Sequence, residues 1–455
     1  MTISAKKRIW GWWFFDWASQ PYNTLLLTFS FGPYFADVAR AYFVAQGQSA
    51  ELSQASAQAY WTGAQTITGI IIAILAPVLG VIADGGGRKM PWIWLFSAMY
   101  VVGAYLLWWT MPEMPTLFWA AFWFSFGFIG MELATNFTNA LLPSLASQEE
   151  MGRISGTGFA FGYLGGVIAL FIFLLFFAED PKTGKTLIGF SPAFGLDPET
   201  RAGTRSVGPF TAIWYIVFMV PFFLWVKEPI ARGKRRIGDS FAQLGTALRG
   251  LKDRPSLLVF LIASMFYRDA LNATYALGGA FASNVMGWTV IQSGIFGIVA
   301  AIAATIASWA GGKLDSSIGP KPVIVLAVMV LTVTIIVMMN LTPVSLFGVM
   351  LGEGSNLPNM VFYGCGVVIG AAGGIAQAAS RTLMVFHTNS EDAAGDFGFY
   401  GLSGKATAFL APGLITIVTT MTGSARMGIA PLAVLFLIGL VLLVWVNPRG
   451  EGAAR

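Results

Sequence analysis

Long apolar stretches dominate the chain, and short polar segments separate them. A membrane-spanning helix needs about 20 apolar residues in succession, and twelve stretches meet that need. Their approximate limits are 10–36, 59–83, 91–111, 116–141, 154–178, 209–226, 256–282, 289–312, 321–341, 358–386, 397–421 and 427–446. The pattern predicts an all-α membrane protein with twelve transmembrane helices. The even number places both termini on one side of the membrane.

The start of the chain carries three basic residues, Lys6, Lys7 and Arg8, before the first apolar stretch. A cleaved signal peptide would continue with a short apolar run and a small-residue cleavage site. A long apolar run without such a site follows instead. We therefore interpret it as a retained first membrane helix.

Composition agrees with a membrane location and excludes other classes of protein. Of 455 residues, 56% are hydrophobic and 11% are charged, and the mean hydropathy is +0.69, whereas soluble domains are about 25% charged. A water-soluble enzyme, a secreted scaffold and a disordered protein are excluded. One cysteine, Cys365, and one histidine, His387, cannot make an internal disulfide or a His/Cys zinc site. We expect no catalytic residue, metal or cofactor, and a solvated His387 in a turn.

Lysine and arginine residues are distributed unequally between the two predicted sides of the membrane. One side holds 18 of the 27, the other holds 6, and three lie within spans. Because cytoplasmic loops carry the excess of these residues, the first side and both termini are predicted to be cytoplasmic. A bacterial inner membrane is the expected location. The net charge of +5 then reflects topology, and no nucleic-acid partner is expected.

The longest predicted cytoplasmic loop, residues 227–255, separates six spans from six spans and contains eight basic and three acidic residues. We predict a six-helix bundle at 1–226, a basic linker at 227–255 and a second six-helix bundle at 256–455. The centre of the linker, residues 238–251, is either a plain orienting segment or an interfacial helix that meets anionic lipid.

The two predicted halves repeat four short motifs in the same order, at offsets between 231 and 253 residues. Such near-constant spacing indicates a duplicated six-helix unit. The pairs are Phe14-Phe15-Asp16 with Phe266-Tyr267-Arg268-Asp269, Gly80-x-x-x-Asp84 with Gly311-x-x-x-Asp315, Gly130-Met131-Glu132 with Gly374-Ile375-Ala376-Gln377, and Gly165-Gly166 with Pro412-Gly413.

The turn after the second span carries the most specific pattern, which reads GVIADGGGRK at residues 80–89. It resembles the cytoplasmic signature of the major facilitator superfamily. The resemblance implies two pseudo-symmetric six-helix bundles, with ion pairs at this turn that latch the cytoplasmic side in one state. The alternative is a tight basic turn that only sets topology. The predicted gating residues are Gly80, Asp84, Gly87, Arg88, Lys89 and Asp315.

Longer segments from both halves resemble a narrower family. They are FFDWASQPYNTLLLTFSFGPYF at 14–35, NALLPSLA at 139–146, ISGTGFAFGYLGG at 154–166, GGIAQAASR at 373–381 and GDFGFYGLSGKATAFLAPGL at 395–414. These segments are similar to bacterial relatives of the vacuolar amino-acid effluxer family linked to autophagy. The resemblance implies a secondary transporter and, more weakly, an amino-acid-like solute.

Polar residues inside the predicted spans are the candidates for a transport site, because a charge near the bilayer centre costs several kcal/mol unless a cavity or a partner holds it. They form rows at helical spacing on spans 1, 4, 7 and 10, with one more on span 11. In major facilitators, the first four of these line the central cavity. The candidates for substrate binding or coupling are Glu132, Asp269, Asp16, Gln20, Asn23, Asn136, Asn139, Arg268, Asn272, Gln377, Arg381 and Lys405.

The sequence as a whole predicts a secondary transporter that moves a small polar or zwitterionic solute by alternating access. We expect proton coupling through Glu132, with Asp269 as the alternate and Arg381 as the preferred partner of Glu132. The expected partners of the protein are the lipid bilayer, the solute and protons. An exporter or flippase of an amphipathic lipid or drug is the first alternative. A membrane-embedded enzyme or a non-transporting receptor is the second.

Overall fold

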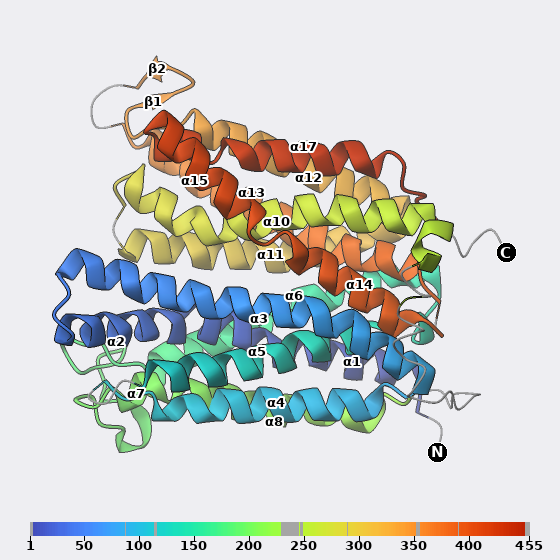
Figure 1. Cartoon of the computed structure of the whole chain (residues 1–455), viewed down its shortest axis with the longest axis horizontal. Helices are drawn as coiled ribbons and strands as arrows, with labels where there is room; N and C mark the ends of the chain where they lie inside the picture. The colour runs from blue at the N-terminus through green and yellow to red at the C-terminus, as the bar shows by residue number, and fades with distance from the viewer. Residues whose placement is uncertain are drawn as a thin grey trace. The chain divides into compact units, whose positions relative to one another are not determined.

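The computed structural model describes residues 3–86, 88–112, 116–228, 245, 249–288, 290–351, 355–389 and 391–450. Helices make up nearly all of this part, together with one short hairpin (Figure 1). Gly87 and most of the predicted linker lie outside the described residues.

The chain divides into two compact units. Unit 1 contains Met1–Ile72, Arg88–Thr138 and Phe161–Ala231, and unit 2 contains Ala73–Gly87, Asn139–Ala160 and Arg232–Arg455. Segments that precede the linker in the sequence, among them the end of the third helix, therefore count with unit 2. The division into bundles at 1–226 and 256–455 stays a prediction.

Unit 1 consists of long helices, and α1 and α4 both pack along α8. Its core is aromatic, with the Tyr100 and Tyr215 rings stacked at 3.9 Å between centroids and Tyr215 in a 2.8 Å hydrogen bond with Ser97. The elements that lie wholly or partly in this unit are α1 (Ala5–Pro21), the π-helix η1 (Tyr22–Phe29), α2 (Phe31–Ala45), α3 (Ala50–Gly86), α4 (Met90–Leu106), the 3-10 turn η2 (Leu107–Trp109), α5 (Leu117–Asn139), α6 (Gln148–Phe176), α7 (Ala202–Arg205) and α8 (Val207–Trp225). The end of α3 and the start of α6 belong to unit 2.

The first predicted span is interrupted. It passes from α1 through the π-helix η1 to α2, with a non-helical residue at Ser30. Pro21, at the end of α1, has no amide hydrogen to donate, which weakens the regular ladder at this point. The buried Tyr22 then donates to the carbonyl of Phe124 (2.7 Å), and Thr28 donates to the carbonyl of Asn23 (2.8 Å). These bonds hold the irregular turn in place.

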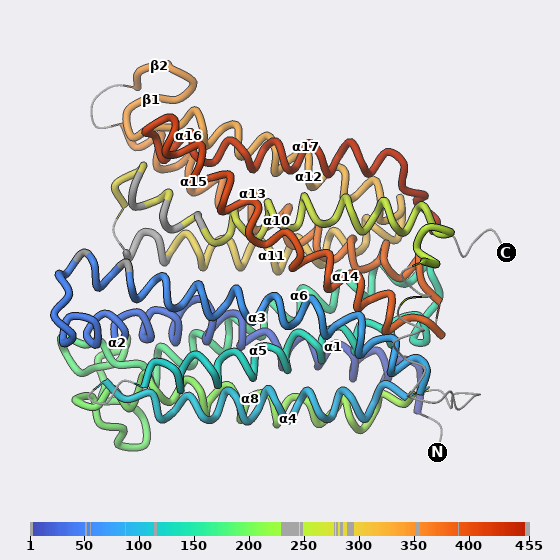
Figure 2. Tube along the Cα trace, in the orientation of Figure 1, coloured from blue at the N-terminus to red at the C-terminus, as the bar shows by residue number. Residues whose placement is uncertain are grey.

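In unit 2, α11 and α12 pack beside α13 (Figure 2). The helices α10 and α12 pack beside α17. A small hairpin pairs Ser345 with Met350 and Leu346 with Val349. The elements are the 3-10 turns η3 (Leu142–Ser144) and η6 (Leu251–Asp253), with α10 (Pro255–Asn284), α11 (Val290–Ile318), α12 (Pro320–Met339), β1 (Ser345–Leu346), β2 (Val349–Met350), α13 (Leu357–Phe386), α14 (Ala393–Ala406), α15 (Leu410–Thr422), α16 (Ala425–Gly428) and α17 (Ala430–Leu443).

Eleven helices in the described part of the chain are long and apolar enough to cross a membrane. The remaining predicted span is the interrupted first one. Large apolar side chains stay exposed along these helices, such as Phe118 at 73% and Ile67 at 61%. Water would penalise such faces, whereas lipid accommodates them. The structure therefore agrees with the predicted all-α membrane protein.

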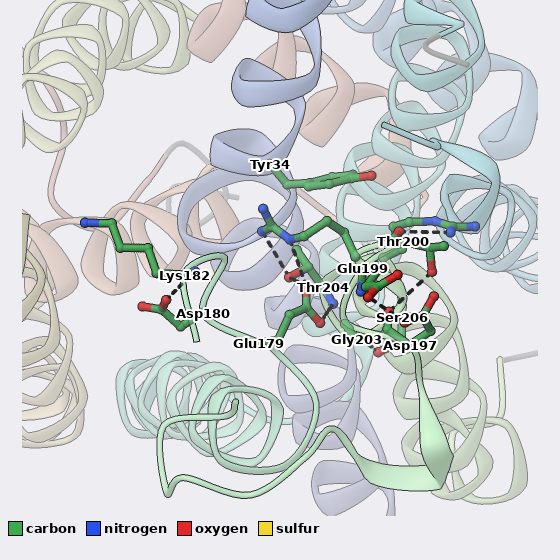
Figure 3. A network of polar contacts seen from close by, with 12 residues as sticks. Tyr34, Glu179, Asp180, Lys182, Asp197, Glu199, Thr200, Gly203, Thr204 and Ser206 are labelled. Carbon is green, nitrogen blue, oxygen red and sulfur yellow. Dashed lines mark hydrogen bonds and ion pairs between the residues drawn. The ribbon is translucent and has the colours of Figure 1, made fainter. Parts of the chain in front are cut away.

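The connection between α6 and α8 is fastened by a buried ion pair (Figure 3). Glu179, which is 4% exposed, accepts from Nε of Arg201 (2.8 Å) and from both the amide (3.0 Å) and the hydroxyl (2.6 Å) of Thr204. Arg205 donates from Nε and Nη2 to the carbonyl of Trp108 (2.9 and 2.8 Å). The connection is thus tied through α7 to the 3-10 turn η2, which follows α4.

We expect Glu179→Gln to lower the stability of the protein by about 2 kcal/mol, because the change leaves the half-buried Arg201 without its counter-ion and weakens the hydrogen bonds of the buried carboxylate. The measurement is the midpoint of thermal unfolding in detergent. Glu199→Gln, the same change at an exposed position of this connection, is the control and should leave the midpoint unchanged. Equal midpoints for all three proteins would contradict a structural role of the ion pair.

Candidate functional site

The predicted gating acid Asp84 lies at the end of α3 and contacts the first turn of α14. Its carboxylate accepts from the backbone amides of Ala394 (3.2 Å) and Gly395 (2.6 Å). The amides at a helix N-terminus lack partners within the helix and carry partial positive charge. Asp84 therefore holds α3 to α14 by a charge-assisted contact with the backbone.

Glycines allow the helices to approach closely here. A Cβ atom on Gly80 would lie 2.2 Å from the carbonyl oxygen of Ala394, and one on Gly398 would lie 2.5 Å from that of Ala76. A Cβ on Gly156 would lie 2.5 Å from the Cα of Gly312, where α6 meets α11. Any larger side chain would separate these backbones. We refer to Gly80, Gly152, Gly156, Gly312, Gly395 and Gly398 together as the glycine seam.

The second copy of the motif also lies at the seam, but with different partners. Asp315, near the end of α11, is 3% exposed and packs against Gly152 of α6, where a Cβ would come within 2.7 Å of its Cγ. The next residue, Ser316, accepts from the amide of Arg153 through its hydroxyl oxygen (2.9 Å). The two predicted motif copies thus occupy similar places at helix ends.

Arg381 forms a polar node in the same unit. It is 3% exposed and donates from Nε to Oγ of Ser155 (3.0 Å), from Nη2 to the carbonyl of Ser155 (2.7 Å) and from Nη1 to Oδ1 of Asn139 (3.4 Å). Its guanidinium carbon lies 4.2 Å from the centre of the Phe159 ring. The structure therefore brings two of the predicted residues, Asn139 and Arg381, together at the start of α6.

Arg268 and Asp269 of α10 flank an interruption of the eleventh predicted span, which ends as α14 at Ala406 and resumes as α15 at Leu410. Asp269 is 4% exposed and accepts from the amide of Ala411 (3.0 Å), in the first turn of α15. Arg268 donates to the carbonyl of Tyr400 (2.9 Å) and lies 4.1 Å from that ring's centre. Negative charge at the start of one helix and positive charge near the end of the other are both favourable.

A charged cluster around Arg254 and Asp396 was not expected from the sequence. Arg254 donates to both carboxylate oxygens of Asp396 (2.8 Å each) and to the carbonyl of His387, while Thr388 donates to Asp396 (2.5 Å). The expectation of a solvated His387 is wrong, because the side chain is 2% exposed and its Nε2 shares a 2.7 Å hydrogen bond with Ser256. Since 142 residues separate Arg254 from Asp396, no local pattern signals this cluster.

The candidates of the first and fourth spans lie in unit 1. Nδ2 of Asn23 is 4.0 Å from the sulfur of Met131, which places η1 beside α5. Glu132 is half-buried on α5. Asn136, one turn further, is 7% exposed, and its buried Nδ2 has no hydrogen-bond partner within the described residues. A buried amide of this kind is costly unless a ligand or water meets it.

The other candidates occupy varied surroundings. Backbone and side-chain atoms of Asp16 and Gln20 approach Gly162 and Gly166 of α6. Lys89 is buried, and its amide donates to Glu228 (2.6 Å) at the start of α4. The remaining predicted residues are Asn272 and Arg88, which are exposed, and Gln377 and Lys405, which are half-buried.

Comparison with known proteins identifies the family. A family model described as "Vacuole effluxer Atg22 like" matches residues 4–453. The chain belongs to the Atg22-like vacuole effluxer family. The resemblance predicted from the quoted segments is thereby confirmed.

Two relatives show the breadth of the Atg22-like family. An uncharacterized MFS-type transporter of Bacillus subtilis (strain 168), YxiO, is 23% identical over 441 residues, which cover 96% of this chain and 94% of the relative. Autophagy-related protein 22 of Cryptococcus neoformans var. neoformans serotype D (strain B-3501A) is 22% identical over 305 residues, which cover 64% of this chain and 52% of the relative. The match thus spans about half the length of the fungal protein.

Solved structures similar to this Atg22-like chain include two sugar symporters. The major facilitator proton:xylose symporter XylE bound to 6-bromo-6-deoxy-D-glucose has a TM-score of 0.71 at 10% identity and covers 98% of this chain and 96% of that chain. The E. coli fucose:proton symporter FucP has a TM-score of 0.67 at 14% identity, covering 97% of this chain and 98% of that chain. These identities show the fold alone. The predicted major facilitator fold is confirmed.

The contact of Asp84 with α14 predicts how fast a cysteine at the neighbouring buried position 83 is alkylated. A buried thiol is alkylated only when its surroundings open, so its rate reports the open fraction. In a Cys365→Ala background, we expect Ala83→Cys, a position that is fully buried, to react about tenfold faster when Asp84→Asn is added. Loss of one charge-assisted hydrogen bond, about 1.5 kcal/mol, accounts for that factor.

Asp37→Asn is the matched control for the alkylation measurement. Asp37 is exposed and lies 3.6 Å from Arg40 in an ion pair within α2, where surface pairs contribute little. The rate at Ala83→Cys should stay unchanged in this variant. If Asp84→Asn also leaves it unchanged, the carboxylate does not hold α3 to α14.

Proposed function

We propose that this protein is a secondary transporter that moves a small zwitterionic solute, such as an amino acid, by alternating access and with proton coupling. The observation that carries the proposal is the glycine seam with its charged contacts. Its helices meet through hydrogen bonds from backbone amides to side chains and through bare glycine surfaces. Such contacts can separate and re-form as a layer without dismantling an interdigitated core.

Orientation follows from the charges of the loops. The Asp84 end of α3 is adjacent in sequence to Arg88 and Lys89, and the linker contributes eight further basic residues. The positive-inside rule assigns such segments to the cytoplasm. We therefore propose a bacterial inner-membrane protein with cytoplasmic termini, whose cytoplasmic gate is the closed glycine seam.

The solute site proposed here centres on η1 and α5 in unit 1. Asn23, Glu132 and Asn136 supply an amide, a carboxylate and a second amide within a short stretch of these elements. The buried Nδ2 of Asn136 supports a ligand, since the described protein gives it no acceptor. A carboxylate accepts from an ammonium group, and amide donors bind a carboxylate group, so the set suits a zwitterion.

Several of the other candidates already hold helices together. Asp269 and Arg268 support the interruption between α14 and α15, and Arg381 holds Ser155 and Asn139. Coupling is therefore proposed at Glu132 first and at Asp269 second. To pair with any other group, Arg381 would have to leave Ser155 of α6 and Asn139 of α5, which ties the proposed coupling to opening of the seam.

The solute class is tested by a thermal-shift screen of purified protein with amino acids, peptides, sugars and lysolipids. A ligand that binds the folded state raises the unfolding midpoint. We expect an amino acid to give a rise that Asn136→Leu removes and that Asn340→Leu, the same change at the end of α12, retains. A rise with lysolipids alone would replace the zwitterion by an amphipathic substrate.

Coupling is tested in proteoliposomes with the identified solute. Glu132→Gln resembles the protonated carboxyl permanently, so we expect it to abolish accumulation driven by a pH gradient while solute exchange continues. Asp269→Asn is the second variant. Accumulation at the wild-type level in both variants would rule out proton coupling at these carboxylates and favour a facilitative or other-ion mechanism.

A further inference from the structure

Asp315 differs from Asp84, the acidic residue of the first motif copy, in its hydrogen bonding. Both of its carboxylate oxygens are buried, and neither has a hydrogen-bond partner among the residues that the structure describes. The hydroxyl of Thr382 lies nearby, but it donates to the carbonyl of Ala378 (3.2 Å). The side chain lies against Gly152, the fifth residue of α6, past the free amides of the first turn.

The contrast with Asp84 is chemical. Asp84 receives two backbone amides, and such donors stabilise an ionised carboxylate. Asp315 occupies the corresponding place in the second repeat without any such donor. Burial of an ionised carboxylate that lacks a partner costs so much free energy that the group takes up a proton instead.

No cation in the described surroundings is directed at Asp315 to offset that cost. Arg153 of α6 pairs with Glu150 (3.0 Å), and Arg381 of α13 donates to Ser155 and Asn139. On α11 itself, the ammonium of Lys313 lies 3.5 Å from the centre of the Trp309 ring. Each nearby positive charge is thus directed at another group.

We propose that Asp315 is a proton-binding site of the gate: the seam between α6 and α11 closes on the neutral carboxyl, and opening the seam releases its proton to water. The inference rests on the proposed alternating access but not on coupling through Glu132. Opening hydrates the carboxyl, which then ionises. The ionised group resists closure, because closing would bury its charge against Gly152.

The sign of the pH effect follows from this linkage. The closed seam holds one proton more than the open seam, so lower pH favours closure and higher pH favours opening. A proton taken up at closure comes from the side on which the seam opens. The gate would thereby respond to the pH of that compartment, which is the cytoplasm in the proposed orientation.

A buried cysteine in the seam provides the test. Ser308 of α11 is fully buried, its hydroxyl has no partner in the described part of the chain, and a Cβ on Gly156 would come within 2.6 Å of its carbonyl. Ser308→Cys in a Cys365→Ala background therefore adds a reporter at little cost. Its alkylation rate is measured in detergent from about pH 6 to pH 9, with neither solute nor gradient, and is divided by the rate in the same protein with Asp315→Asn.

Division cancels the pH dependence of the thiol itself, since both proteins carry the same reporter. We expect a ratio near one at low pH that rises about tenfold at high pH, as each pH unit above the midpoint changes the protonated fraction tenfold. The control Asp84→Asn should raise the rate by the same factor at every pH, because the hydrogen bonds that it weakens come from backbone amides, which do not titrate in this range. A ratio that stays flat across the range overturns the proposal.

A second uncharged variant, Asp315→Leu, keeps the test decisive if Asp315→Asn does not fold. Replacing a buried carboxyl without partners by an apolar side chain is expected to keep or raise the unfolding midpoint, so Asp315→Leu should be well folded and show the same flat pH response as Asp315→Asn. A marked fall in the midpoint of Asp315→Leu would mean that the carboxyl has stabilising partners, and would contradict the proposal. If Glu132→Gln still accumulates solute, coupling at Glu132 is ruled out, but the alkylation and unfolding results for Asp315 keep their meaning.

Discussion

Contacts of carboxylates with helix ends, made possible by glycine, are the interaction on which unit 2 depends. Asp84 meets two free amides of α14 only because Gly80 lets the backbones touch. In lipid, an unsatisfied backbone amide is expensive, so a helix end inside or near the membrane needs an acceptor. The same requirement explains Asp269, which accepts from Ala411 where α15 begins.

The seam is well suited to repeated opening. A hydrophobic core of interlocked side chains would resist separation, because each side chain must leave a fitted cavity. Glycine surfaces meet without interlocking, and the polar contacts across them are few and local. The free energy of closure then resides in a small number of charged or protonated groups. In the proposed gate the two motifs divide this task, with Asp84 accepting from two amides of α14 and Asp315 buried without an amide donor in the described structure.

Similarity between two motifs does not require equal chemistry at both. Asp84 and Asp315 stand at the ends of α3 and α11, yet the first has amide donors and the second has none in the described structure. At the second motif the neighbouring residue Ser316 makes the hydrogen bond, because its hydroxyl accepts from the amide of Arg153. The two similar motifs thus make different contacts, which a motif comparison alone treats as one.

The sequence by itself determined the all-α membrane class and the family, because long apolar stretches and short motifs are local properties of the chain. It could not show that the first and eleventh spans are interrupted, although Pro21 and Pro412 were signals of weakened ladders. Nor could it distinguish Asp269, which caps a helix, from a solute ligand. Only the tertiary structure decided the surroundings of Asp269, Arg381, Asp315 and His387, since residues far away in sequence pack against each of them and their approach depends on how glycine-bearing helices pack.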